Sequence, residues 1–297
     1  MPLSKELETV LKKIRARAAE VRHSLDEDRL SYERIVQDYA LAQDTAQEPV
    51  GAGGVPALWF TAPNANRDRV VLYFHGGGYV IGSNRTHAGM MSYLSRSAQA
   101  RVLGVDYRLA PENPFPAQVE DAVTSYRWLL SQGYEPGNIA LAGDSAGGGL
   151  TVSTLVSLRY LADPLPAAGV CISPWVDLEA TGKTYETNAE VDPSVSRDRT
   201  LNLAKVVLAG KNPAAPLASP IHADLTGLPP LLVQVGAIEV LVDDSNMLVA
   251  RAKAASVQVE LELWDGMPHV WHQHAPFLPE ALQAIESIGA FVKKHVS

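Results

Sequence analysis

Apolar residues follow two different spacings along the chain. Short continuous apolar runs that are rich in β-branched and aromatic residues are typical of strands. Such runs read ALWF, VVLYF, RVLGVD, NIALAG, AGVCIS, LLVQVG and VQVELELW. Apolar residues at intervals of three and four indicate helices over residues 88–98, 118–131, 149–161, 243–256 and 279–295. Because strands and helices alternate, the pattern predicts an α/β fold with a mostly parallel central sheet and helices on both faces.

Two segments interrupt this alternation. Residues 1–45 are mostly polar, but some of their apolar residues recur at helical spacing, and the turn-rich break EPVGAGGVP follows them. The apolar residues concerned are Leu7, Val10, Leu11 and Ile14, then Tyr32, Ile35, Val36 and Tyr39. Between CISPW and LLVQVG lie more than fifty residues, including the helix candidate TLNLAKVVLAG, and a simple crossover needs far fewer.

These interruptions predict the domain organisation. We expect an N-terminal helical cap segment over residues 1–45 and an α/β domain over residues 46–297, with a cap insertion at about 180–220. The two cap segments together would roof a site at the sheet. An extra helical layer far from any site is the alternative.

Composition narrows the class of protein. The chain has 297 residues, of which 46% are hydrophobic and 20% charged, and its formal net charge is −8. A net negative charge without a basic cluster argues against a nucleic-acid partner. The single cysteine, Cys171, excludes an intramolecular disulfide and a cysteine zinc site. No apolar run approaches a membrane span, and the N-terminus lacks the apolar core of a signal peptide, so we expect a cytoplasmic protein.

The first candidate for chemistry is the segment GDSAG at residues 143–147, between a predicted strand and a predicted helix. It matches G-x-S-x-G, in which a sharp turn lifts the hydroxyl of Ser145 above the strand ends. The N–H of Ala146 then points toward an oxyanion at the helix N-terminus. A glycine-rich turn of this kind is also typical of phosphate sites, but neither G-x-G-x-x-G nor a G-K-[ST] ending is present.

A second glycine-rich segment, HGGGYVIG, directly follows the strand VVLYF. Consecutive glycines let the backbone approach a ligand and leave N–H groups exposed. We therefore expect the N–H groups of Gly76 and Gly77 to complete the oxyanion hole with Ala146. His75 precedes these donors, and we expect it to hold the loop by hydrogen bonding rather than to act as a base.

A serine nucleophile needs a base and an acid that orients the base, in the chain order serine, acid, histidine. His269 stands in WDGMPHVW, in the loop after the strand VQVELELW, and is the expected base. We expect His272 and His274 to face solvent or the rim of the site.

The acid is expected after the preceding strand, LLVQVG. Glu239 lies on the loop that follows this strand, and Asp243 is the second candidate. Asp243 and Asp244 fall at the start of the next predicted helix, where an N-cap role would explain at least one of them. Asp144 is too close to Ser145 to act as the acid, so we expect it to have a local hydrogen-bonding role.

With these pieces in order, the chain resembles the hormone-sensitive lipase family of α/β-hydrolases, also called bacterial esterase family IV. The blocks that carry the resemblance are HGGGYVIGS, DYRLAPENPFPA, GDSAGGGL, GAIEVLVDDS and WDGMPHVWH, and they run from about Val70 to the C-terminus. The aspartate before the serine places the chain in the GDSAG subgroup. The resemblance implies the α/β-hydrolase fold, and residues 1–45 and 180–220 fit the family's cap.

The same resemblance implies roles for individual residues. It supports Ser145, Glu239 and His269 as the catalytic triad, with Gly76, Gly77 and Ala146 as oxyanion donors. Many members carry aspartate in place of Glu239, within D-P-L-x-D, whereas this chain reads E-V-L-V-D. Trp175, Tyr185 and Trp271 are expected to line the substrate pocket or, alternatively, to be core residues.

The resemblance implies a carboxylic ester hydrolase that acts on short- to medium-chain acyl esters through an acyl-enzyme, with no metal or cofactor. An acyltransferase or an amidase would use the same triad. A non-catalytic ligand-binding member of the fold, such as the plant gibberellin receptors, would lack the histidine that this chain has at position 269. Many family members pair through the strand near the C-terminal end of the sheet, which is VQVELELW in this chain, so the resemblance implies a homodimer.

Overall fold

An eight-stranded sheet organises the part of the chain that the structure describes, in the strand order β1-β2-β4-β3-β5-β6-β7-β8. The computed structural model describes residues 4–20, 24–35 and 40–297. The strands are β1 (Ala46–Ala52), β2 (Val55–Thr61), β3 (Asn66–Phe74), β4 (Ala100–Val105), β5 (Ile139–Asp144), β6 (Ala168–Ile172), β7 (Leu231–Gly236) and β8 (Val259–Trp264). Neighbours from β4 to β8 are parallel, whereas β1 and β2 are antiparallel to each other and β2 is antiparallel to β4. The predicted mostly parallel sheet is therefore confirmed.

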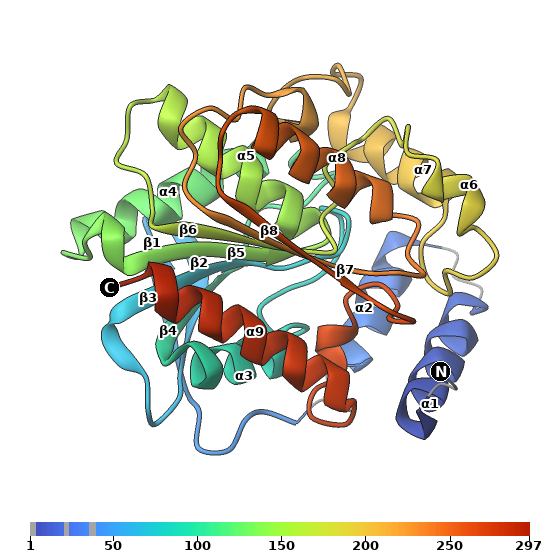
Figure 1. Ribbon diagram of the computed structural model, residues 1–297, viewed down its shortest axis with the longest axis horizontal. Helices are drawn as coiled ribbons and strands as arrows, with labels where there is room; N and C mark the ends of the chain where they lie inside the picture. The colour runs from blue at the N-terminus through green and yellow to red at the C-terminus, as the bar shows by residue number, and fades with distance from the viewer. Residues whose placement is uncertain (1–3, 21–23, 36–39) are drawn as a thin grey trace.

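Helices cover both faces of this sheet. The helices are α1 (Lys5–Ala18), α2 (Leu25–Ile35), α3 (Ala88–Ala98), α4 (Ala117–Ser131), α5 (Ala146–Tyr160), α6 (Thr184–Thr187), α7 (Arg197–Leu208), α8 (Val242–Ala254) and α9 (Pro279–His295). In Figure 1, α3 and α9 lie on one face of the sheet, and α4, α5 and α8 lie on the other. No helix among the described residues is both long enough and apolar enough to cross a membrane.

Alternating side chains of β3 show why the sheet has two covered faces. Leu72 and Phe74 belong to the apolar core on the α4 and α5 side, whereas Val71 and Tyr73 belong to the core on the α3 and α9 side. Successive residues of a strand point to opposite faces, so a strand that is apolar throughout needs cover on both. The edge strand β8 differs, because Leu263 is 56% exposed.

The turn-rich segment EPVGAGGVP is part of a β-hairpin, and the expectation of a simple break was wrong. The strands β1 and β2 pair from Ala46 with Thr61 to Ala52 with Val55. The connection is Gly53 and Gly54, whose φ angles are +67° and +96°. Two positive φ angles suit a tight hairpin turn. Most of β1 is exposed, so it lacks the apolar run that marks the other strands.

The N-terminal helices and the 180–220 region lie at the same end of the molecule. In Figure 1, α1, α2, α6 and α7 gather on the right-hand side. The helical spacing predicted for Tyr32 and Ile35 falls within α2, but Val36 and Tyr39 lie outside the described residues. Helix α7 reaches the loop after β3, because a Cβ on Gly78 would stand 2.8 Å from the side chain of Leu203.

Candidate active site

Ser145 occupies a sharp turn between β5 and α5. Its φ and ψ are 54° and −120°, a strained combination for a residue with a side chain. The turn has no room for side chains on either flank. A Cβ on Gly143 would overlap the carbonyl oxygen of Gly147, and a Cβ on Gly147 would overlap that of Phe74. The residues therefore fold into the strand–turn–helix arrangement that the G-x-S-x-G pattern predicts.

Three side chains that are far apart in the sequence meet at this turn. The Nε2 atom of His269 lies 2.9 Å from Ser145 Oγ, and its Nδ1 atom lies 2.7 Å from Glu239 Oε2. A buried carboxylate can only accept, so His269 donates from Nδ1 and leaves Nε2 free to accept the hydroxyl proton. The arrangement has the geometry of a serine nucleophile, a base and an orienting acid.

Charge around His269 favours its protonated form. Burial lowers the pKa of His269, but the carboxylate of Glu239 outweighs burial, and Asp192 and Asp144 add to its effect, so the pKa is raised above its usual value of 6.5. An imidazole in this environment stabilises the positive charge that forms when it takes a proton from serine.

Sequence reasoning missed Ser173, which supports the acid. The hydroxyl of Ser173 donates to Glu239 Oε1 at 2.7 Å and accepts the N–H of Val270 at 3.3 Å. The Gly236 N–H donates to the same carboxylate oxygen at 2.6 Å. These bonds fix one carboxylate oxygen, so the other faces His269. The available signal was the position of Ser173 directly after β6, the strand between β5 and β7.

The N–H of Gly76 is not available to a substrate. It donates to Asp144 Oδ1 at 3.0 Å. The carbonyl group of the same peptide belongs to His75, and its oxygen accepts the hydroxyl of Tyr107 at 2.6 Å. This peptide is thus held at both ends. The expectation that Gly76 donates to the oxyanion was wrong, because a buried carboxylate takes that N–H.

The next two peptides of the loop turn their N–H groups outward. The His75 Nδ1 atom lies 2.8 Å from the carbonyl of Gly76, whose peptide carries the Gly77 N–H. The carbonyl of Gly77 accepts the N–H groups of Val80 and Ile81, both at 3.1 Å, and its peptide carries the Gly78 N–H. In a trans peptide the N–H points opposite the carbonyl. Within the described chain, the N–H groups of Gly77 and Gly78 have no acceptor.

His75 has the loop-holding role that its position predicts. Its ring stacks on Tyr107 at 4.3 Å between centroids and an angle of 11°. Burial lowers the pKa of His75 to about 3, and the nearby His87 contributes to this shift. His75 is therefore neutral at ordinary pH, with Nδ1 as the donor toward the Gly76 carbonyl.

Asp144 has the local hydrogen-bonding role expected for it. Besides the Gly76 N–H, it accepts the hydroxyl of Tyr73 at 2.7 Å and lies 3.3 Å from His87 Nε2. Burial raises the pKa of Asp144, but His87 and the hydrogen bond from Tyr73 outweigh burial, so the pKa is lowered. The ionised carboxylate links the turn at Ser145 to the glycine-rich loop of residues 76–78, named the oxyanion loop after the role predicted for it.

Asp243 and Asp244 do not contact His269, and neither caps α8 with its side chain. The N-cap of α8 is Leu241, which has no side-chain hydrogen bond of this kind. Asp243 Oδ2 instead accepts the N–H groups of Lys183 and Thr184 at 2.8 and 3.2 Å. Asp244 accepts two backbone N–H groups of residues 176–177, both at 3.0 Å. Both carboxylates hold the backbone at residues 176–184, where the chain enters the 180–220 region.

The aromatic residues expected near the substrate are all buried. Trp271 has no exposed surface and packs in the core beneath α9, so it is a core residue and not a pocket residue. Trp175 and Tyr185 are 3% and 2% exposed in the opposite core. The expectation that His272 faces solvent or the rim was also wrong, because it is fully buried and bonds to Gln234 Oε1 at 2.7 Å.

Among the described residues, one cluster has the composition of a metal site. The ligand atoms of Asp177, Glu179 and His222 lie within 4.8 Å of one another. The Asp177 carboxylate is already occupied, because it accepts the N–H groups of Glu179 and Thr181 at 2.9 and 2.8 Å. None of these residues touches Ser145 or His269 by a hydrogen bond, so we assign no chemistry to the cluster.

Known proteins share this fold. The family model described as the alpha/beta hydrolase fold matches residues 71–273. A crystal structure of an esterase from the bacterial hormone-sensitive lipase family superimposes with a TM-score of 0.98 at 58% identity and covers all of both chains. A structure of EstE5 soaked with p-nitrophenyl butyrate has a TM-score of 0.95 at 44% identity and covers 99% of each chain. An acetyl-hydrolase of Streptomyces hygroscopicus is 47% identical over 87% of this chain and 90% of its own length.

The chain belongs to the α/β-hydrolase family and, within it, to the hormone-sensitive lipase family of bacterial esterases. It is therefore a carboxylic ester hydrolase of the serine carboxylesterase class.

Proposed function

We propose that the protein hydrolyses esters with short- to medium-chain acyl groups through the triad Ser145, His269 and Glu239. The continuous chain of hydrogen bonds from Ser145 Oγ through His269 to Glu239 supports this proposal most directly. Ser145 Oγ attacks the ester carbonyl carbon while His269 Nε2 takes the hydroxyl proton. Glu239 keeps the imidazole in the required tautomer and stabilises its positive charge.

The negative charge that forms on the carbonyl oxygen is stabilised by the N–H groups of Gly77, Gly78 and Ala146. The first two point away from carbonyls that are fixed by His75, Val80 and Ile81. The third stands in the first turn of α5, where the helix dipole favours a negative charge. Each such donor contributes about 3 kcal/mol to lowering the barrier.

His269 returns each proton that it takes, first as the acyl-enzyme forms and again as it is hydrolysed. His269 gives its proton to the alcohol oxygen as the ester C–O bond breaks, which leaves the acyl group bound to Ser145 Oγ. Water then attacks the acyl carbon while His269 takes a proton from that water. The bond between the acyl carbon and Ser145 Oγ breaks as His269 returns the proton to Oγ, and the carboxylic acid leaves.

The acyl preference is tested with p-nitrophenyl esters of graded chain length. We expect kcat/KM to be highest for acetate to hexanoate and to fall for dodecanoate and longer chains. The relatives described as acetyl-hydrolases, and the p-nitrophenyl butyrate used with EstE5, support this range. Release of nitrophenolate at 405 nm is the measurement. Faster turnover of long-chain emulsified esters than of butyrate would contradict the proposal.

We also propose that the N-terminal helices and the 180–220 region form a cap that shapes the oxyanion loop. The clearest contact comes from Arg29 of α2. Its Nε donates to the Val80 carbonyl at 2.9 Å, and its Nη2 donates to the Ala110 carbonyl at 3.1 Å. Arg29 also forms a two-pronged ion pair with Glu112, at 2.7 and 2.8 Å. Since the Val80 N–H holds the Gly77 carbonyl, Arg29 fixes the turn that aims the Gly78 N–H.

Replacing Arg29 with methionine is expected to lower kcat about tenfold with little change in KM, because a loosened oxyanion loop weakens transition-state binding. The control is Arg85→Met. Arg85 also pairs with α2, through Glu33 at 3.5 Å, but its side chain is 79% exposed and does not hold Val80. Steady-state kinetics with p-nitrophenyl butyrate measure both variants. An equal loss of kcat in both would contradict a specific role for Arg29.

A further inference from the structure

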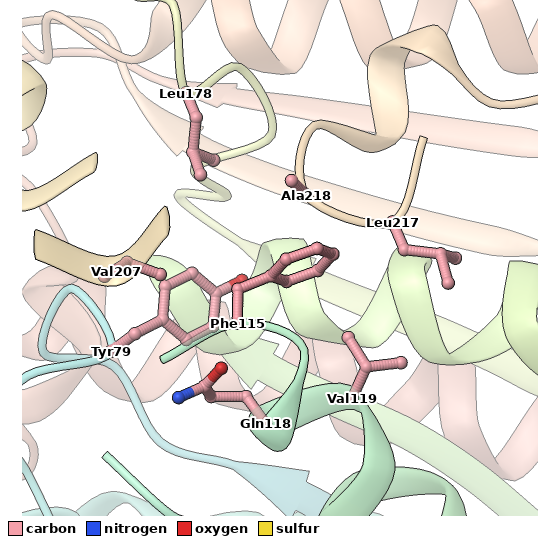
Figure 2. Close-up of a pocket in the computed structure, with 8 residues that line it drawn as sticks. All are labelled: Tyr79, Phe115, Gln118, Val119, Leu178, Val207, Leu217 and Ala218. Atoms are coloured by element: carbon pink, nitrogen blue, oxygen red, sulfur yellow. The ribbon is translucent and has the colours of Figure 1, made fainter. Parts of the chain in front are cut away.

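A small cavity lies between the oxyanion loop, the start of α4 and helix α7. Its free volume is about 10 Å³, and its walls are mainly apolar side chains, including Tyr79, Leu178 and Val207. Figure 2 shows these side chains around the cavity, with the Phe115 ring beside Tyr79. A volume of this size holds one water-sized group. One polar side chain, Gln118, joins the apolar wall.

Hydrogen bonds on the other side of Gln118 fix the orientation of its amide. The Nε2 group donates to the carbonyls of Arg108 and Asn113 at 2.9 and 2.7 Å. Turning the amide over would place its oxygen against two carbonyl oxygens, so the opposite orientation is excluded. The oxygen therefore faces the cavity, and Figure 2 shows it turned toward the side of Tyr79 and Phe115.

The amide oxygen of Gln118 is an acceptor that the described protein does not satisfy. Gln118 is 1% exposed, and its Oε1 atom has no hydrogen-bond partner among the described residues. Most buried acceptors are paired, because leaving one without a donor is unfavourable. An apolar cavity with one inward-facing acceptor selects a small group that carries a hydrogen-bond donor.

The position of the cavity connects it to the reaction. Tyr79 directly follows Gly78 in the oxyanion loop. Leu203 of α7 faces Gly78, and Val207, four residues further along the same helix, lines the cavity. Residues four apart lie on one face of a helix, about one turn from each other. The cavity thus begins about one helical turn from Leu203, the side chain that lies against Gly78. The N–H of Gly78 is one of the proposed oxyanion donors.

We propose that this cavity is a specificity site for a hydroxyl group carried on the ester substrate. One chain of the bound ester runs past Tyr79 along α7, and its hydroxyl group donates to Gln118 Oε1. Because the free volume holds one water-sized group, only the hydroxyl enters, and the carbon atoms that carry it stay at the apolar rim. This inference rests on the proposed function, since it assumes that the ester carbonyl is bound at Ser145.

The test compares hydroxyl-bearing esters with matched plain esters. One arm uses ethyl esters of short- and medium-chain acids with or without a terminal hydroxyl on the acyl chain. The other arm uses butyrate esters of diols and of the corresponding simple alcohols. Acid release is followed by pH-stat titration. In one of the two arms, we expect kcat/KM for the hydroxyl-bearing ester to exceed that of its plain match by about five- to tenfold. That arm identifies the chain of the ester that enters the cavity.

Two variants test the assignment to Gln118. Gln118→Met removes the acceptor at similar size, and Ala218→Val fills the cavity while leaving the Gln118 amide in place. The readout is the ratio of hydroxyl-bearing to plain ester for each protein, and we expect both variants to bring it close to one. The matched control is Gln132→Met, at an exposed glutamine just after the last turn of α4, and it should keep the wild-type ratio.

The outcomes separate this inference from the proposed function. Hydrolysis of plain esters with a ratio near one in both arms overturns the cavity proposal and leaves the proposed function intact. An unchanged ratio in Ala218→Val also overturns it, even if Gln118→Met does not fold. Absence of hydrolysis of every ester by the folded wild-type protein contradicts the proposed function itself.

Discussion

Ser145→Ala is expected to lower kcat for p-nitrophenyl butyrate by about 10⁴- to 10⁶-fold. The substitution removes the atom that forms the acyl-enzyme, and the oxyanion donors that remain assist only a slow direct attack by water. The other members of the triad cannot compensate, because His269 and Glu239 act on the nucleophile and not on the ester carbonyl. Stopped-time assays at high enzyme concentration measure the residual rate.

Folding of the Ser145→Ala protein is the necessary control. Among the described residues, the Ser145 side chain hydrogen-bonds only to His269, so the variant should keep the far-ultraviolet circular dichroism spectrum and the melting temperature of the wild type. Removing the hydroxyl also leaves the close backbone packing at Gly143 and Gly147 unchanged. A folded variant that keeps more than about one hundredth of the wild-type kcat would be inconsistent with covalent catalysis at Ser145.

Glu239→Gln is expected to lower kcat by about 10³- to 10⁴-fold. The glutamine keeps the size of the side chain, but it removes the charge that stabilises the protonated imidazole. Its amide also allows His269 to adopt the wrong tautomer, because an NH₂ group next to Nδ1 favours the form with its proton on Nε2. The His269 ring would then present a donor instead of an acceptor to Ser145.

The pH dependence should change in the same variant. The base must be neutral to take a proton, so wild-type kcat/KM should rise with pH through the raised pKa of His269, above 6.5. Glu239 contributes to raising that pKa, so Glu239→Gln should move the rising limb to lower pH while the plateau falls. A limb that moves to higher pH would contradict the role of the charge.

Asp243→Asn is the matched control for the choice of acid. Asp243 holds the backbone at residues 183–184 and makes no hydrogen bond to His269. We expect this variant to lose some stability but to keep kcat within about tenfold of the wild type, since only distant loop positioning changes. A severe loss confined to Asp243→Asn would mean that the acid had been assigned to the wrong residue.

The proposed triad could be chosen from the sequence because each member follows a predicted strand. Ser145, Glu239 and His269 come directly after or shortly after β5, β7 and β8, which are neighbours or near neighbours in the sheet. Parallel strands bring their carboxyl ends to one edge, so residues far apart in the chain meet there. Three predicted strands and a chain-order rule favoured Glu239 and left Asp243 as the second candidate, and the distance of 2.7 Å between Glu239 and His269 comes from the structure alone.

The oxyanion loop shows where such reasoning fails. The sequence does not distinguish the three consecutive glycines Gly76, Gly77 and Gly78. Only the orientation of each peptide decides which N–H reaches a substrate. That orientation depends on Asp144 and Tyr107, which lie on other strands or loops and carry no signal of this contact in the sequence. The hairpin strand β1 was missed for a different reason, since an exposed edge strand does not need apolar residues.

The support for Glu239 was missed as well, because only the position of Ser173 directly after β6 pointed to it. Ser173 is one serine among many and belongs to no spacing pattern, yet it bonds both to the acid and to the backbone beside the base. Such partners are selected by three-dimensional proximity, and a single sequence gives no measure of it.

The central claim, that Ser145 carries the acyl group, is tested most directly by covalent labelling of the active enzyme. The wild-type protein is treated with diethyl p-nitrophenyl phosphate, nitrophenolate release is counted, and the labelled peptide is identified by mass spectrometry. The account predicts one nitrophenolate per chain, complete loss of esterase activity, and a diethyl phosphate group on Ser145. Loss of activity with the label on another residue, or labelling of Ser145 without loss of activity, would contradict it.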